Sequence, residues 1–281
     1  MTDVATGPVT SDITEEPVTE EIVPTAVGDV KVLRGGDGPP VLWLHSAMGE
    51  AADALCADLA SDFTVAAPYF PGFSGSSGIE QIEDMEDAVY HLLDLMERLE
   101  MVRPIVAGLS LGGWMSAELA VRYPDSVSGL VLANPAGLYI EGHSIGEIFG
   151  RSTAEIADEI FADLEQPLYK LMKGIGSSIE RSLASGAIPF DAVRPHLEAQ
   201  AAVAKLAWNP YLHNPRLRRR LNRVSVPTVV LSGTKDGLIP PAHPEAFAAE
   251  IAGARLERVD AGHMLVLERP DVIATAIRSI S

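Results

Sequence analysis

The sequence is poor in cysteine, in positive charge and in long apolar runs. A single cysteine, Cys56, occurs among 281 residues, which excludes an internal disulfide and fits a reducing cytoplasm. No run of eighteen apolar residues occurs, so we expect no membrane-spanning helix and no membrane partner. The N-terminal stretch has neither a positively charged region nor an apolar core, which argues against a secretory signal. Together these absences predict a cytoplasmic protein.

Positive charge is scarce because 21 Lys and Arg residues face 39 Asp and Glu residues, which gives a formal net charge of −18. Such a surface repels nucleic acid and anionic membranes, so neither is expected as a partner. Residues 1–18 are acidic, contain proline and threonine, and precede the first basic residue, Lys31. This composition predicts a disordered acidic tail. An arginine cluster at residues 216–223 is interpreted as a solvated helix face.

What the sequence does contain is an alternation of short apolar runs and helical patterns. Apolar runs predict buried strands at 41–44, 63–67, 105–107, 127–133, 227–232 and 256–259, and two more short strands are expected between Glu20 and Arg34. Helical patterns occur at 51–59, 82–99, 114–123, 244–251 and 270–280. This alternation predicts an α/β fold, with a mostly parallel, eight-stranded sheet covered by helices on both faces.

The alternation of strands and helices stops after Gly137. Between about Tyr139 and Tyr211 the sequence has no strand pattern, and helical patterns occur instead at 145–149, 154–164, 168–183 and 193–206. A helical block inserted between two strands is interpreted as a lid over the carboxyl end of the sheet. We therefore expect a core formed by residues 19–138 and 212–281, and a helical cap domain at 139–211.

The motif Gly-x-Ser-x-Gly occupies residues 108–112, between an apolar run and a helical pattern, with Ser110 at its centre. A serine on a sharp strand-to-helix turn sits in strained backbone, and a Cβ two residues to either side would collide with it. The turn presents the serine oxygen to a substrate and directs the first N–H groups of the helix to the same place, where they can stabilise an oxyanion. A serine that only caps the helix is the alternative interpretation.

A serine hydroxyl is a weak nucleophile and needs an adjacent base. His263 can supply one, because neutral imidazole titrates near neutral pH. Asp236 follows the apolar run 229–231, which places it at the same sheet edge as Ser110, where its carboxylate can hold the imidazole in one tautomer. A role for Asp236 as a simple turn former is the alternative. No His or carboxylate spacing matches a metal-ligand set, so no metal site is expected.

Four motifs in this chain order resemble those of the α/β-hydrolase superfamily. The first is the motif around Ser110, and the second is the segment His45-Ser46-Ala47-Met48-Gly49, which is similar to the oxyanion-loop motif His-Gly-x-x-Gly. The third is the segment 233–240, which is similar to the turn that carries the catalytic acid in this superfamily. The fourth is Ala261-Gly262-His263, which is similar to the loop that carries the catalytic histidine. The resemblance spans about Glu20 to Ser281. It implies a triad of Ser110, Asp236 and His263, with the backbone N–H groups of Ala47 and Leu111 as oxyanion donors.

Two positions depart from the common pattern of this superfamily. Tyr69 stands where an acidic residue often precedes the segment that begins at Pro71, a difference that we interpret as structural. Ser46 stands where a glycine usually follows the histidine of the oxyanion loop. We therefore expect an oxyanion loop that is shaped differently or that carries an additional hydroxyl donor.

The nucleophile narrows the activity that the resemblance implies. Haloalkane dehalogenases and epoxide hydrolases of this superfamily need an aspartate where this chain has Ser110. We expect a cofactor-free serine hydrolase that cleaves a carboxylic ester, thioester or lactone through an acyl-enzyme. Carbon–carbon bond hydrolases of ring-fission products share the layout but commonly carry a tryptophan after the catalytic histidine, where this chain has Met264. Peroxidase-like and acyltransferase-like members share the triad, so the sequence does not exclude either activity. A receptor-like binding protein is the least favoured alternative.

The expected partner is a small-molecule, ester-like substrate. No cationic clamp is evident beside the triad, so we expect the substrate to be apolar, uncharged and of small to medium size. The predicted substrate contacts are Ser46, Leu109, Tyr139, Trp208 and Met264. Apolar lid helices could also form a dimer contact, so a monomer and a homodimer are both compatible with the sequence.

Overall fold

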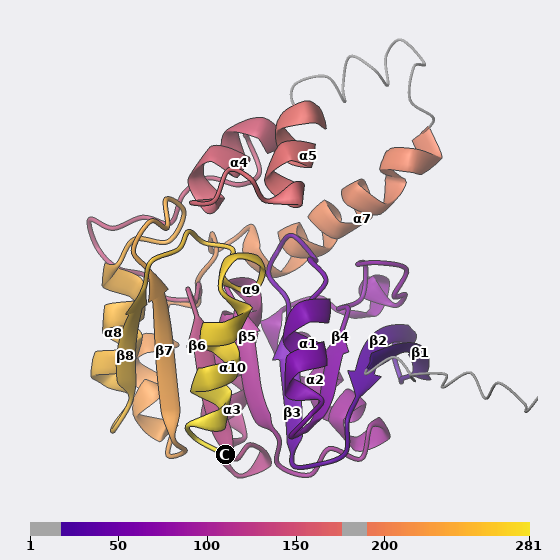
Figure 1. Ribbon diagram of the computed structural model, residues 1–281, viewed down its shortest axis with the longest axis vertical. Helices are drawn as coiled ribbons and strands as arrows, with labels where there is room; N and C mark the ends of the chain where they lie inside the picture. The colour runs from indigo at the N-terminus through magenta and orange to yellow at the C-terminus, as the bar shows by residue number, and fades with distance from the viewer. Residues whose placement is uncertain (1–17, 176–189) are drawn as a thin grey trace, which may run out of the picture.

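The computed structural model describes residues 18–175 and 190–281. Within these residues eight strands form one sheet in the order β1-β2-β4-β3-β5-β6-β7-β8 (Figure 1). The strands are β1 (Val18–Pro24), β2 (Asp29–Gly35), β3 (Pro40–Leu44), β4 (Thr64–Pro68), β5 (Ile105–Leu109), β6 (Gly129–Ala133), β7 (Thr228–Gly233) and β8 (Arg255–Val259). β2 pairs antiparallel with β1 and β4, whereas all other pairs are parallel. The predicted mostly parallel sheet is confirmed.

Helices cover both faces of the sheet. On one face α1 (Asp53–Leu59) packs with α10 (Pro270–Arg278), next to the short α9 (Leu265–Glu268). On the other face α3 (Leu111–Arg122) packs with α2 (Met85–Arg98), and the 3₁₀-helix η3 (Arg218–Arg223) joins α3 to α8 (Ala242–Glu250). Two further 3₁₀-helices are η1 (Ile79–Gln81) and η2 (Pro124–Ser126).

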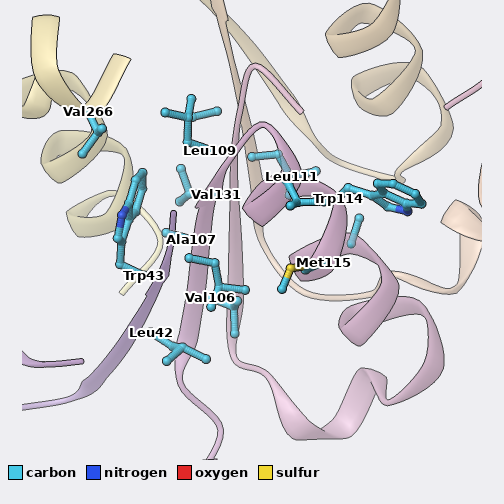
Figure 2. Close-up of a cluster of buried hydrophobic side chains, with 14 of the residues drawn as sticks. Leu42, Trp43, Val106, Ala107, Leu109, Leu111, Trp114, Met115, Val131 and Val266 are labelled. Atoms are coloured by element: carbon cyan, nitrogen blue, oxygen red, sulfur yellow. The ribbon is translucent and has the colours of Figure 1, made fainter. Parts of the chain in front are cut away.

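The central strands are apolar along their whole length because a helix layer buries each face. All five residues of β5 and all five of β6 are buried. Figure 2 shows Trp43 of β3 beside Val266 of α9 on one side of these strands, and Leu111 and Met115 of α3 on the other. Successive residues of a strand point to opposite faces, so a strand covered on both sides must be apolar at every position. This double burial is the reason that short unbroken apolar runs marked the strands in the sequence.

In the described part of the inserted segment, α4 (Thr153–Ile160), α5 (Pro167–Ile175) and α7 (Phe190–Ala207) lie beyond the carboxyl ends of the parallel strands (Figure 1), and we call these helices the lid. The chain leaves and rejoins the sheet layer at neighbouring points, since the N–H of Gly137 donates to the carbonyl of Leu212 and the N–H of Asn214 donates back to Gly137. The division into a core and a separate cap domain at 139–211 stays a prediction. The predicted acidic tail lies outside the described residues, except for Val18 in β1.

Two helix predictions in the lid were wrong in detail. The predicted helix at 145–149 is irregular, because the N–H of Gly146 donates to Leu238 O and the N–H of Ile148 donates to the Tyr211 hydroxyl instead of to an earlier turn. The helix predicted at 154–164 ends at Ile160. Its last carbonyl accepts hydrogen bonds from the loop around His263, so tertiary contacts replace the next helical turn. The second half of the helix predicted at 168–183 lies outside the described residues.

No helix in the part of the chain that the structure describes is long and apolar enough to cross a membrane.

We predict that Gly112→Ala lowers the free energy of unfolding by about 2–3 kcal/mol, because overpacking at a close contact cannot relax without moving backbone. A Cβ at Gly112 would lie 2.2 Å from the carbonyl oxygen of Leu44. Urea unfolding followed by circular dichroism measures the change. The matched control is Gly174→Ala in α5, where nothing lies within 4 Å of the added Cβ. Equal stabilities of the two variants would show that the contact at Gly112 is not tight.

Candidate active site

Ser110 occupies the turn between β5 and α3, with φ 56° and ψ −109°. This left-handed conformation is strained for a residue with a side chain. The turn closes so tightly that a Cβ at Gly108 would lie 2.4 Å from Gly112, and a Cβ at Gly112 would strike the end of β3. Both glycines of the motif are therefore required by contact. The collision predicted within the turn holds for Gly108, whereas Gly112 is required by its approach to the end of β3.

Hydrogen bonds hold the strained residue in place. The N–H of Ser110 donates to Ala133 O at the end of β6 (2.9 Å), and its carbonyl accepts from the N–H groups of Trp114 (2.9 Å) and Ala136 (3.1 Å). The neighbouring strand and the first turn of α3 thus fix the backbone from both sides. The side chain of this buried serine lines a cavity beneath the lid.

His263 lines the same cavity, and Asp236 lies behind it. His263 Nδ1 lies 2.8 Å from Asp236 Oδ2, and both side chains are 2% exposed. The other carboxylate oxygen accepts the N–H groups of Leu238 (2.8 Å) and Ile239 (2.9 Å), so the aspartate is fixed and its charge is satisfied. Because an ionised carboxylate only accepts, Nδ1 carries the proton, and Nε2 is left as the basic nitrogen.

The side chain of Asn134 connects the loops that carry the aspartate and the histidine. Asn134 follows β6 with φ 40°, and its amide NH₂ donates to the carbonyls of Gly262 (3.1 Å) and His263 (2.9 Å). Its amide oxygen accepts the N–H of Gly233 at the end of β7 (2.8 Å). Asn134 therefore holds the loop of Asp236 and the loop of His263 in register.

Two backbone N–H groups are free at the cavity end of β3 and at the start of α3. Ala47 lines the cavity, and Leu111 is the first residue of α3, directly after Ser110. Neither N–H has a hydrogen-bond acceptor among the residues that the structure describes. The assignment of these two groups as oxyanion donors stays a prediction, and their free N–H groups are compatible with it.

The cavity has a volume of about 70 Å³ and is mostly apolar. Its polar groups gather at the sheet end, where Ser46, Ser110 and His263 lie, with Thr153 and Gln200 on the lid side. No Lys, Arg, Asp or Glu belongs to the lining that the described residues form. The apolar lid side is built chiefly from Ile148, Phe149, Ile156, Ile160, Met172 and Val203.

Of the five predicted substrate contacts, the structure places only Ser46 in the lining of this cavity. Leu109 and Met264 are completely buried in the core. Tyr139 and Trp208 are largely exposed, and each packs its ring on another aromatic side chain, His213 and Phe149 respectively. These four side chains thus lie outside the lining. Leu109 belongs to the buried strand β5, whereas Tyr139 lies in an irregular segment and Trp208 follows the end of α7.

No group of three or more His, Cys, Asp or Glu side chains that could hold a metal ion occurs among the described residues. Cys56 is buried in α1, and burial raises the pKa of its thiol to about 12. The thiol is therefore protonated at neutral pH and acts as a small core residue, as expected.

A family model described as the alpha/beta hydrolase fold matches residues 39–270. The chain therefore belongs to the α/β-hydrolase fold family. It is 26% identical over 185 residues to the pimeloyl-[acyl-carrier protein] methyl ester esterase of Aromatoleum aromaticum, an alignment that covers 63% of this chain and 73% of that relative. The fold family and the esterase among the relatives support the assignment of this chain to the hydrolases.

Solved structures agree on the fold. The 2-hydroxy-6-oxo-6-phenylhexa-2,4-dienoate hydrolase of Rhodococcus sp. strain RHA1 superposes with a TM-score of 0.73 at 23% identity and covers 93% of this chain and 98% of its own. The carboxylesterase CesB of Bacillus subtilis gives a TM-score of 0.70 at 21% identity, with 94% and 91% covered. At such identities the likeness concerns the fold, so the choice of reaction depends on the site itself.

We predict that Asn134→Asp lowers the free energy of unfolding by about 2–4 kcal/mol at neutral pH, since a carboxylate would face two carbonyl oxygens where an NH₂ group donated. Urea unfolding measures the loss. The control is Asn222→Asp, an exposed position in η3, where the change should stay within about 0.5 kcal/mol. A loss no greater than in the control would mean that Asn134 does not hold the two loops.

Proposed function

We propose that the protein is a serine hydrolase that cleaves a carboxylic ester, or a thioester or lactone, of a small to medium apolar substrate through an acyl-enzyme on Ser110. The observation that carries this proposal is the arrangement at the cavity. Ser110 and His263 line one apolar cavity, and Asp236 is hydrogen-bonded to the far nitrogen of His263. Serine nucleophile, imidazole base and orienting carboxylate are the parts that acyl transfer needs.

In the proposed mechanism the Ser110 oxygen attacks the substrate carbonyl carbon while His263 Nε2 takes the hydroxyl proton. The negative charge that develops on the carbonyl oxygen is stabilised by the free N–H groups of Ala47 and Leu111. His263 then returns the proton to the departing alcohol, which leaves an acyl-enzyme. Water, deprotonated by His263, releases the acid, and Asp236 stabilises the imidazolium in both steps.

The lining favours a neutral substrate. Its lid side is apolar, and no charged side chain among the described residues faces the cavity, so a charged group on the substrate would be desolvated without a partner. A methyl ester esterase among the relatives supports ester cleavage.

Carbon–carbon bond hydrolysis is the second candidate, because a dienoate hydrolase shares the fold over nearly its whole length. A dienoate carries a carboxylate, for which the described lining offers no cationic side chain. The site therefore favours the ester. Cofactor-free peroxidase or acyltransferase activity uses the same triad, and product analysis with added alcohol or amine separates acyl transfer from hydrolysis. A receptor-like role stays the least favoured alternative, and a cytoplasmic location stays a prediction. The oligomeric state, monomer or homodimer, is left open.

We expect Ser110→Ala to lower the turnover of p-nitrophenyl esters by about a thousandfold or more, since the nucleophile is lost. Wild type and variant are compared on acetyl to decanoyl esters, and the acyl-chain length with the highest turnover measures the length of the pocket. Ser61→Ala, an exposed position in the turn after α1, is the control and should match wild type.

Two results would contradict the proposal. Equal activity of wild type and Ser110→Ala would mean that another group is the nucleophile. A wild type that is inactive on every ester but turns over a 2-hydroxy-6-oxo-dienoate would establish the second candidate instead.

A further inference from the structure

The loop between β3 and α1 holds a buried carboxylate, Glu50, that the proposed mechanism does not use. Glu50 is 7% exposed, and Ser46, four residues earlier, is 1% exposed and lines the cavity. No lysine or arginine in the described ranges forms an ion pair with Glu50. Burying a carboxylate costs several kcal/mol unless hydrogen bonds meet its charge. Two donors meet it here, and both belong to Ser46.

The contacts of Ser46 determine the shape of the loop. Its N–H donates to Glu50 Oε1 (2.9 Å), and its hydroxyl donates to Glu50 Oε2 (2.5 Å). The same hydroxyl oxygen accepts the N–H of Met48 (3.0 Å), and the Ser46 carbonyl accepts the N–H of Gly49 (3.1 Å). His45 braces the loop from the other side, since its Nδ1–H donates to the Ser46 carbonyl (2.6 Å). Every polar group of Ser46 is therefore engaged.

This arrangement leaves one N–H group free at the centre of the loop. Of the three consecutive N–H groups at residues 46–48, the first is taken by Glu50 and the third by the Ser46 hydroxyl. Only the middle one, on Ala47, has no acceptor among the described residues. The Ser46 hydroxyl, which was expected as an additional donor to the substrate, points its proton at Glu50 instead. A glycine at position 46 could make neither of the hydroxyl contacts.

We infer that Glu50 is a positioning residue, which acts through Ser46 to hold the oxyanion loop with the Ala47 N–H directed at the reacting carbonyl oxygen. The inference rests on the proposed function and deepens it. Glu50 does not touch the substrate, and its negative charge near a developing oxyanion is unfavourable by itself. Glu50 contributes by fixing the geometry of the loop, because hydrogen-bond donors such as the Ala47 N–H stabilise a transition state best when they are in place before its charge develops.

The test compares Glu50→Gln, Glu50→Ala, Ser46→Gly and the double variant Ser46→Gly/Glu50→Ala. We expect each single variant to lower kcat for p-nitrophenyl acetate ten- to a hundredfold, less than the hundred- to thousandfold loss of a whole donor, with KM within about twofold. Affinity for an alkylboronic acid, which forms a tetrahedral anionic adduct on Ser110, should fall by the same factor. Because Glu50 acts through Ser46, the double variant should be no worse than the worse single variant.

The controls separate positioning from folding. Glu245→Gln removes an exposed carboxylate that pairs with Arg258 and should leave kcat and boronic acid affinity unchanged. Glu50→Gln keeps the size of the side chain and one acceptor oxygen, so a folded variant is expected by circular dichroism.

Three outcomes would overturn the inference. The first is an unchanged kcat and an unchanged boronic acid affinity in folded Glu50→Gln. The second is that the losses of Ser46→Gly and Glu50→Ala multiply in the double variant. The third is a loss that is confined to KM. Boronic acid binding needs no turnover, so it tests Glu50 even if p-nitrophenyl esters fail as substrates and the ester assignment falls. If the wild type binds no boronic acid, the inference falls together with the proposed function.

Discussion

The strained backbone of Ser110 is the constraint on which the rest of the site depends. A non-glycine residue at φ 56° and ψ −109° costs on the order of 1–3 kcal/mol and persists only where its surroundings leave no alternative. Those surroundings are the parallel register of β5 with β6, which supplies the acceptor at Ala133, and two glycines that allow β3, β5 and α3 to meet at contact distance. The sheet thus holds the serine oxygen at its carboxyl edge.

The sheet could be predicted from sequence because local pattern and tertiary environment agree there. A strand buried on both faces must be apolar throughout, and an unbroken apolar run next to a glycine-rich turn has few other interpretations. The lid is different. The segment 145–149 has helical spacing, yet its N–H groups find acceptors on Leu238 and Tyr211, which are about 60 to 90 positions away in the chain. Nothing in the local pattern specifies such partners.

The same distinction applies within the site. That Ser110, Asp236 and His263 lie close together was predictable, because each lies in a loop that follows a strand and parallel strands bring their carboxyl ends together. The spacing of residues along the sequence does not specify where a side chain points in an irregular segment. Tyr139 and Trp208 were therefore predicted to contact the substrate, although both are largely exposed. Glu50 was overlooked for a related reason. Its partner lies four residues away, but in a loop and not on a helix face, so no periodic pattern pairs the two.

The lid and the catalytic loops form one hydrogen-bonded unit at the end of α4. The carbonyl of Glu159 accepts the N–H of Gly237 beside the aspartate, and the carbonyl of Ile160 accepts the N–H groups of His263 and Met264. Glu268 completes the unit, because its carboxylate accepts backbone N–H groups of Ala162 and Asp163 in the lid and of Gly262 in the histidine loop. Since Ile156 and Ile160 also line the cavity, the residues that shape the substrate space are tied to those that place the base. A change in this part of the lid therefore alters both together.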